Sequence, residues 1–272
     1  MSEKSQLQKE KEVGIQKELE LEEAKAKWRS EGDEAEYYFD ETGKGKYGTL
    51  QDAIDNETAY YKSLDVLKNV VTKQNNKIKN AENNVSKAEK EFNDVKDSVK
   101  FVADFYKEVF KVYGEKAEQL AKALANQAKG KKTRNANDAL KSYEKHKANI
   151  NKKINAKDRK AIATALESVK VADIANNFKR FSKGMGYAGI AIDVNDLRIE
   201  LIKAYQTDNW RPFFVKAETI MAGMAATAVV GFAFSFLLGG PIGLLGYGLI
   251  MAVVGALIDD KLVEDANKLI GI

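Results

Sequence analysis

The chain has 272 residues, of which 31% are charged, and contains no cysteine, so disulfides and thiolate metal sites are excluded. This length allows one or two domains, and the two prolines among abundant Ala, Lys, Glu and Leu favour helices, with almost no sheet expected. The N-terminal region is too charged for the apolar core of a secretory signal peptide, so any export would use another route.

The net charge of +4 conceals two blocks of opposite sign. Residues 1–41 carry thirteen acidic and seven basic side chains, whereas residues 122–160 carry thirteen basic and three acidic ones. A basic block is often only a solvated helix face, and nucleic-acid binding is the usual functional alternative. No nucleic-acid motif is present, and each Lys or Arg near an acidic membrane adds about 1 kcal/mol of attraction. We therefore expect anionic lipid, and no nucleic acid, as the partner of this block.

Residues 1–48 are predicted to form an acidic helix followed by a turn. The sequence from Glu3 to Arg29 is charged and helix-favouring, with only scattered apolar side chains. Glycines at 43, 45 and 48 then interrupt the pattern, which predicts a turn near residues 42–48.

Residues 49–100 are predicted to form a long helical rod. Apolar side chains recur at alternating spacings of three and four, which is the pattern of a coiled-coil seam. Small alanines in this seam imply close packing against a partner helix, for which the acidic N-terminal helix is the local candidate. The expected role is a spacer or part of a receptor-binding region. The two seam positions hold Val71, Ile78, Val85, Phe92 and Val99, and Gln74, Ala81, Ala88, Val95 and Val102.

After residue 101 the pattern changes to shorter amphipathic helices. Pro212 suits the first turn of one of them, because its missing N–H would be unpaired there anyway. The predicted segments are 136–149, 156–168, 171–180 and 188–206, with a short amphipathic helix within 259–272. Two apolar stripes precede them, Phe101, Phe105, Val109 and Val112, then Leu120 and Leu124.

The forty residues 219–258 carry no formal charge. Residues 219–238 and 242–258 each approach the ~20 residues that cross a ~30 Å hydrocarbon core. Seventeen Leu, Ile, Phe and Val residues favour the membrane by about 5 to 10 kcal/mol, a gain that eight glycines dilute. Such a segment must be buried or lie in lipid, so we expect a helical hairpin wrapped by other helices. Its predicted membrane residues are Ile220, Val229, Val230, Phe232, Phe234, Phe236, Leu237, Leu238, Gly239, Gly240, Pro241, Ile242, Leu244, Leu245, Leu249, Ile250, Val253, Val254, Leu257 and Ile258.

Charged residues flank this hairpin on both sides. Glu218, Asp259 and Asp260 can keep the helix ends in water. They can also make insertion depend on pH, because an ionised carboxylate is costly in lipid and a protonated one much less so.

The basic block is the segment that a membrane voltage would move. One charge crossing the bilayer gains ~2.3 kcal/mol per 100 mV, so ten net charges would gain about 23 kcal/mol as an upper bound. The segment that voltage would move contains Lys129, Lys131, Lys132, Arg134, Lys141, Lys145, Lys147, Lys152 and Lys153.

Signals of catalysis are weak. The single histidine, His146, lies in a Lys-rich stretch. An ordinary exposed side chain is therefore a simpler interpretation than a general base. No phosphate-binding GxxxxGK[ST], HExxH or GxSxG motif occurs. We therefore expect neither an enzyme nor a cofactor or metal site.

Five segments resemble the channel domain of the pore-forming colicins, over roughly residues 95–272. The likeness is nearest to the subgroup of colicin K and colicin E-one, whose hydrophobic hairpin is of the longer kind. The segments are AKALANQAKGKK at 121–132, INAKDRKAIATALESVK at 154–170, FSKGMGYAG at 181–189, NWRPFFVK at 209–216 and GALIDDKLVEDANKLIGI at 255–272.

The resemblance implies an all-α fold, in which a globular bundle of about ten helices encloses the hairpin and follows the rod. Residues 101–272 would be the pore-forming domain, with its hairpin at 219–258. It further implies a bacteriocin that is released in soluble form, enters the inner membrane of sensitive bacteria and opens a voltage-gated channel that depolarises the cell. The implied protein partners are a membrane-embedded immunity protein in the producer and an outer-membrane receptor and translocation machinery in the target.

The N-terminal part departs from that family pattern. Family members usually carry a flexible translocation region and a complete receptor-binding region before the channel domain, whereas this chain begins with an acidic helix and half of a possible rod. A fragment, a compact relative and a different import route all remain open. Two other functional classes also remain: a static membrane-anchored coiled-coil interaction protein, and a secretion-system translocator.

Overall fold

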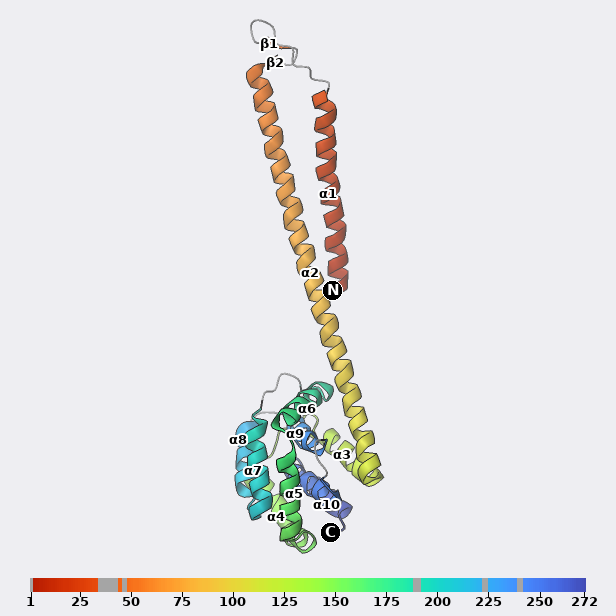
Figure 1. Cartoon of the computed structure of the whole chain (residues 1–272), viewed down its shortest axis with the longest axis vertical. Helices are drawn as coiled ribbons and strands as arrows, with labels where there is room; N and C mark the ends of the chain where they lie inside the picture. Colours follow the sequence, from red (N-terminus) through yellow and green to blue (C-terminus); the bar gives the residue numbers. More distant parts are fainter. Residues whose placement is uncertain (1, 34–43, 46–47, 188–191, 222–224, 239–241) are drawn as a thin grey trace. The chain divides into compact units, whose positions relative to one another are not determined.

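The computed structural model describes residues 2–33, 44–45, 48–187, 192–221, 225–238 and 242–272 (Figure 1). The chain divides into two compact units, Met1–Phe92 and Asn93–Ile272. The prediction of an all-α fold is confirmed, since the described residues form eleven helices and one pair of two-residue strands. The elements are α1 (Glu3–Asp33), β1 (Lys44–Gly45), β2 (Gly48–Thr49), α2 (Leu50–Tyr113), α3 (Glu115–Ala128), α4 (Ala136–Lys153), α5 (Ala156–Ser168), α6 (Val171–Gly184), α7 (Val194–Thr207), α8 (Arg211–Met221), α9 (Ala226–Leu237), α10 (Leu244–Ala256) and α11 (Asp260–Leu269).

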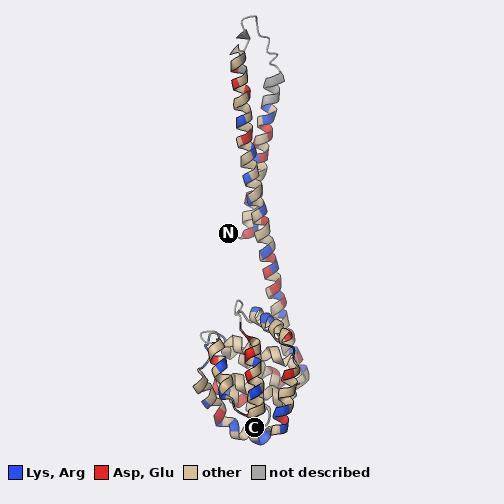
Figure 2. Cartoon of the chain, turned by 60° about the vertical axis from the view of Figure 1, so that its left-hand side comes forward, with Lys and Arg blue, Asp and Glu red and all other residues tan. Residues whose placement is uncertain are grey.

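In the first unit, α1 runs antiparallel to the N-terminal part of α2 (Figure 1). Early residues of α1 pair with residues of α2 near the end of this unit, as Lys4 does with Glu89 at 2.8 Å. The approach is close at Gly14, where a Cβ atom would lie 2.7 Å from the Ile78 side chain. The acidic helix is therefore the partner of the rod within this unit. Charges of both signs are interspersed along the two helices (Figure 2).

The connection between α1 and α2 contains β1 and β2, which pair antiparallel with Gly45 opposite Gly48. The remaining residues of the turn predicted near 42–48 lie outside the described residues.

The predicted seam of α2 is only partly buried. Gln74 and Ala81 are buried, and the Gln74 amide donates to the Glu10 carbonyl oxygen at 2.9 Å. The expectation for Phe92 is wrong, because its side chain is 70% exposed. It lies beyond Glu89, where the ion pair with Lys4 marks the N-terminal end of α1. Val95 and Val99 are also exposed, whereas Val102 is buried.

In the second unit, α9 and α10 form the centre of the bundle. All twelve residues of α9 are buried, and α10 is buried from Gly246 to Ala256. The surrounding shell comes from α3 to α8, α11 and the last turns of α2, and α11 packs along α10. Ring contacts connect the shell to the centre, since Phe105 of α2 lies 4.5 Å from Phe234 of α9 between ring centroids.

The first hydrophobic arm is shorter than predicted. Residues 219–221 belong to the last turn of α8 and not to a helix running from 219 to 238. The reason lies in the local spacing, because Phe214, Ala217 and Met221 bury one face of α8 while Thr219 stays exposed. Among the residues that the structure describes, no helix combines the length and apolar character needed to cross a bilayer.

The shell helices follow the predicted order, and their starts have local causes. Asn155 and Asp158 form a capping box that begins α5, and Asp193 caps α7 by accepting from two backbone N–H groups. The amphipathic prediction for α11 is confirmed by its buried Leu262, Val263 and Ala266. The stripe prediction is wrong for Val112, which is exposed because α2 turns its Phe105 and Val109 face to the core.

Candidate membrane-insertion site

The loop between α3 and α4 contacts the base of the hydrophobic hairpin, which consists of the start of α9 and the end of α10. The Ala226 N–H at the start of α9 donates to the Lys131 carbonyl oxygen at 2.9 Å, and Lys132 and Ala225 form an antiparallel β-bridge. The Arg134 N–H donates to the carbonyl oxygen of Leu257, at the end of α10, at 2.8 Å. We call these contacts, together with the ion pairs of Asp259 and Asp260 described next, the clasp.

The clasp satisfies backbone groups that the helix ends leave free. The first N–H groups of an α-helix have no partner within the helix, and buried unpaired groups are costly. Ala225 occupies the N-cap position of α9 and cannot supply a side-chain acceptor. The Lys131 carbonyl oxygen takes that role for Ala226, so the basic loop stabilises the start of the hairpin.

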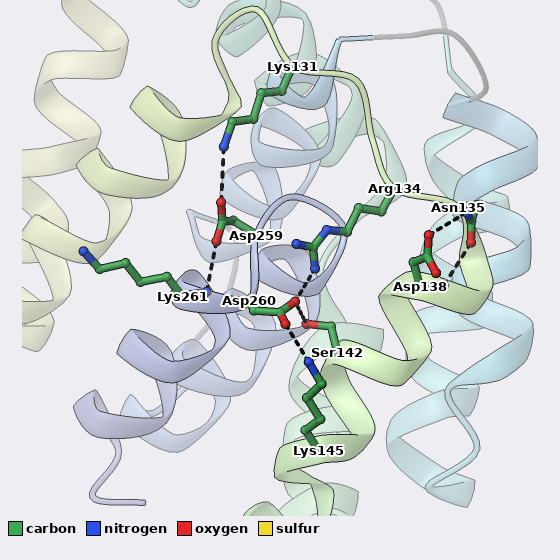
Figure 3. Close-up of polar contacts among 9 residues, drawn as sticks. All are labelled: Lys131, Arg134, Asn135, Asp138, Ser142, Lys145, Asp259, Asp260 and Lys261. Carbon is green, nitrogen blue, oxygen red and sulfur yellow. Dashed lines mark hydrogen bonds and ion pairs between the residues drawn. The ribbon is translucent and has the colours of Figure 1, made fainter.

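Two acids that follow the hairpin bind the same basic segment (Figure 3). Asp259 pairs with Lys131 at 3.3 Å and accepts from the Lys261 N–H as the N-cap of α11. Asp260 pairs with Arg134, and it accepts from Lys145 Nζ and Ser142 Oγ, each at 2.7 Å. These contacts bring together two residue sets that the sequence suggested separately.

The same contacts change the acidity of the two carboxyls. The hydrogen bonds from Lys145, Arg134 and Ser142 lower the pKa of Asp260 well below its ordinary value. The Lys261 N–H, followed by Lys131, lowers the pKa of Asp259. Both groups therefore remain ionised in the folded bundle at acidity that would begin to protonate an ordinary aspartate.

The acid before the hairpin contacts the basic segment as well. Glu218, in the last turn of α8, accepts from the Ala136 N–H at 2.9 Å. Ala136 is the first residue of α4, and the side chain of the N-cap residue Asn135 accepts from the backbone N–H of Asp138. A carboxylate is favourable at a helix N-terminus, because the helix dipole is positive there. All three predicted flanking acids thus hold the region between Lys131 and Lys145.

The remaining basic residues of the segment that voltage was predicted to move divide into two groups. Lys147 donates to the Asp208 carbonyl oxygen at 2.9 Å and lies 3.6 Å from its carboxylate. The others form no ion pair with an acid of the described residues, namely Lys129, Lys132, Lys141, Lys152 and Lys153.

The opposite end of the hairpin, which we call the tip, is held by side chains. The Tyr113 hydroxyl, at the end of α2, donates to the Ile242 carbonyl oxygen at 2.5 Å, and the Tyr247 hydroxyl donates to the Ala117 carbonyl oxygen at 2.7 Å. Leu244 is 41% exposed. The predicted tip residues Gly239, Gly240 and Pro241 lie outside the described residues.

Most of the predicted membrane residues are buried in this bundle. Three are only partly buried, namely Leu238, Leu245 and Ile220, the last of which lies in α8. The buried ones are Val229, Val230, Phe232, Phe234, Phe236, Leu237, Ile242, Leu249, Ile250, Val253, Val254, Leu257 and Ile258.

Sequence reasoning missed two polar features of the shell. Arg159 is buried and its guanidinium lies 3.2 Å from the Asp208 carboxylate. The Tyr187 ring packs against the backbone of α9 at Gly231. No periodic signal in the sequence marks either contact. Within the described ranges, no group of three His, Asp or Glu side chains could hold a metal ion.

Most of the chain is similar to a known protein family. Residues 81–269 match the family model described as the colicin pore-forming domain. Colicin-Ia of Escherichia coli is 60% identical over 65% of this chain, and the matched part is 28% of colicin-Ia. Colicin E-one of Escherichia coli is 33% identical over 72% of this chain and 38% of its own length. Colicin-Ia is thus more similar to this chain than colicin E-one is, whereas the sequence motifs placed the likeness nearest to colicin K and colicin E-one.

Solved structures agree with the sequence matches. A structure described by the import of pyocin S5 into Pseudomonas aeruginosa gives a TM-score of 0.76 at 41% identity, covering 81% of this chain and 47% of that one. A colicin Ia structure gives 0.71 at 52% identity, covering 80% of this chain and 36% of that one. The chain spans less than half the length of these relatives. Because the family match covers more than half of the residues, the chain belongs to the family of colicin pore-forming domains.

Proposed function

We propose that this chain is a channel-forming bacteriocin that inserts into the inner membrane of sensitive bacteria and depolarises them. The observation that carries the proposal is the burial of a charge-free hairpin whose base is bound by a basic loop. A buried apolar hairpin can exchange protein contacts for lipid, and a basic segment next to it responds to both anionic lipid and voltage. The proposed function is conduction of ions through a voltage-gated channel, without catalysis.

The hairpin is the proposed membrane anchor. The interval between the flanking charges contains forty residues, enough for two passes at about 20 residues each. Exposed lysines such as Lys132 and Lys141 draw the bundle to anionic lipid. Loosening of the shell at the membrane then releases α9 and α10. Glu218, Asp259 and Asp260 oppose release while they are ionised, and the low pKa of the two aspartates places their protonation in more acidic conditions than usual.

The basic segment is the proposed voltage sensor. Residues 122–160 carry a net charge of +10, so complete crossing at 100 mV would gain about 23 kcal/mol. This upper bound exceeds the ~5 to 15 kcal/mol that stabilises a typical folded protein. An interior-negative membrane therefore draws the segment inward and opens the channel.

The wider biology follows from the relatives and is proposed for this chain. The protein is released from its producer, crosses the outer membrane of the target through a receptor and translocation machinery, and becomes integral to the inner membrane. A membrane-embedded immunity protein protects the producer. The rod of residues 49–100 is a spacer or part of the receptor-binding region, and residues 101–272 are the pore-forming domain.

Replacing Val230 by aspartate tests the anchor. Val230 lies in α9, and a charge there opposes transfer into lipid by about 2.5 to 3.5 kcal/mol. The same change also buries a charge in the folded bundle, so Val263→Asp in α11 is the matched control, because both valines are fully buried. We expect Val230→Asp to lose dye release from anionic vesicles and Val263→Asp to retain it. Equal dye release by wild type and Val230→Asp would refute the anchor.

Single-channel recording separates this function from the two rival classes. The protein purified without detergent should give voltage-dependent conductance by itself in a planar bilayer. A static membrane-anchored interaction protein would give permanent membrane association without conductance. A secretion-system translocator would need partner proteins for strong activity.

A further inference from the structure

A buried polar cluster lies among the shell helices α4, α5, α7 and α8. Its guanidinium comes from Arg159 in α5, which is only 6% exposed and lies 3.2 Å from the Asp208 carboxylate. Asp208 is the C-cap of α7, and its carboxylate also accepts from the Asn151 amide at 2.8 Å and the Trp210 indole at 3.2 Å. One buried ion pair therefore connects these helices.

Two tyrosines complete this group of residues, which we call the shell cluster. Tyr143 comes from α4 and Tyr205 from α7, and both side chains are fully buried. Their rings pack against the same Trp210 indole, with ring centroids 5.0 and 5.1 Å away. The shell cluster thus consists of Tyr143, Arg159, Tyr205, Asp208 and Trp210.

Three buried polar atoms of the shell cluster have no hydrogen-bond partner among the described residues. They are the hydroxyls of Tyr143 and Tyr205 and Nη1 of Arg159. Nη1 is the atom of the ion pair with Asp208, but the pair lacks hydrogen-bond geometry. Buried polar atoms are nearly always hydrogen-bonded in folded proteins, because an unpaired one is costly. Three such atoms in one cluster therefore indicate a bound molecule.

The three atoms lie within electrostatic reach of one another. Burial raises the pKa of the Tyr143 hydroxyl, and the nearby Arg159 opposes that rise. Burial also raises the pKa of the Tyr205 hydroxyl, on which both Tyr143 and Arg159 act. Both hydroxyls therefore keep their protons, and each can donate one hydrogen bond and accept others.

The balance of charge favours a neutral molecule over an ion. The Arg159 guanidinium and the Asp208 carboxylate cancel within the cluster. Lys147, 3.6 Å from that carboxylate, has a side chain that is 32% exposed, so solvent screens its charge. A buried water molecule needs two to four polar partners, which the two hydroxyls and Nη1 supply as donors and acceptors.

We propose that the shell cluster binds one buried water molecule between Tyr143, Tyr205 and Arg159. The water accepts from Arg159 Nη1 and from one hydroxyl, and it donates to the other hydroxyl. It thereby joins α4, α5 and α7 by hydrogen bonds that no pair of side chains supplies directly.

Tyr187 provides a matched control within the same shell. Its hydroxyl is also buried and has no hydrogen-bond partner among the described residues. Burial raises the pKa of Tyr187, and its hydroxyl lies against the backbone of α9 at Gly231. A lone hydroxyl beside an apolar helix does not provide the two partners that a water needs.

Thermal unfolding of the full chain, followed by near-ultraviolet circular dichroism, tests the water through three single variants and one double variant. Tyr143→Phe and Tyr205→Phe should each lower Tm by roughly 2 to 4 °C, the shift expected for loss of one hydrogen bond in a domain of this size. The double variant should lose less than the sum, because both hydroxyls hold the same water. Tyr187→Phe should leave Tm unchanged or raise it.

Two results of this experiment would contradict the proposal. If Tyr143→Phe and Tyr205→Phe behave like Tyr187→Phe, their hydroxyls bind nothing. If the two losses simply add, the hydroxyls share no bound molecule.

A crystal structure of the full chain identifies the bound molecule. One water should lie within about 3 Å of both hydroxyls, and it should be absent from the double variant. Crystals grown in sodium bromide should give no anomalous bromine signal at that position. A bromine signal there would mean that the cluster binds an anion, and absence of any density in the wild type would refute the site.

Discussion

Replacing Gly231 by alanine tests how closely the shell fits the hairpin. A Cβ atom at position 231 would overlap the Tyr187 hydroxyl and lie 2.7 Å from the ring carbon that bears it. The Tyr187 ring is 6% exposed and packs against Phe178, so it has little room to move. Overpacking of this severity costs about 3 kcal/mol, and the better helix propensity of alanine returns about 1 kcal/mol. The expected net loss is about 2 kcal/mol, or a fall in Tm of roughly 4 to 8 °C.

A double-mutant cycle isolates the contact. The Tyr187 hydroxyl is buried and has no hydrogen-bond partner among the described residues. Tyr187→Phe alone should therefore be neutral or stabilising, since it removes a buried polar group that costs about 1 to 3 kcal/mol when unpaired. In the double variant the overlap with the hydroxyl is gone, so the Gly231→Ala loss should shrink by about 0.5 to 3 kcal/mol.

Urea unfolding of the full chain, followed by near-ultraviolet circular dichroism, measures all four proteins. Vesicle dye release provides the functional reading, because a looser shell should release the hairpin faster. The reasoning is refuted if Gly231→Ala is as stable as wild type, or if the effects of the two substitutions simply add.

Two further predictions concern the clasp and the basic segment. Because the folded pKa of Asp260 is lowered, its stabilisation is present above the ordinary pKa of about 4 and is lost as the pH falls through the lower folded value. Asp260→Asn should therefore lower Tm at pH 7, with a gap to wild type that narrows below about pH 4; a gap independent of pH would contradict this. The carboxylate is 39% exposed, so the loss at neutral pH should be about 1 kcal/mol. Replacing Lys131, Lys132 and Lys141 by glutamine should make channel opening less steeply dependent on voltage in planar bilayers, and an unchanged steepness would remove this segment from gating.

The order of the helices could be predicted from the sequence because its signals are local. The heptad of α2, the apolar face of α11 and the charge-free hairpin each depend on residue spacing within one segment. The start of α9 was misplaced, because composition alone does not separate residues 219–221, which complete an amphipathic helix, from the fully buried residues that follow.

The clasp could not be predicted, because it joins residues far apart in the chain. Lys132 and Ala225 are paired through their backbones, which leave no mark in side-chain spacing. The sequence did supply both halves of the ion-pair network, as flanking acids and as a basic block. Their union at Asp260 depends on how α4 and α11 pack, which is a tertiary property.

When Trp28, the other tryptophan of the chain, is replaced by phenylalanine, the buried Trp210 becomes a single optical reporter. Its indole is fully buried, donates to the Asp208 carboxylate at 3.2 Å, and lies 5.0 Å from the ring of Tyr143 in α4 and 5.1 Å from that of Tyr205 in α7. Separation of α4 from α7 and α8 would expose the indole to water and shift its emission to longer wavelength. A hairpin that leaves the bundle while α4, α7 and α8 stay together would keep Trp210 between the rings of Tyr143 and Tyr205, so the emission wavelength distinguishes release of the hairpin from separation of these helices.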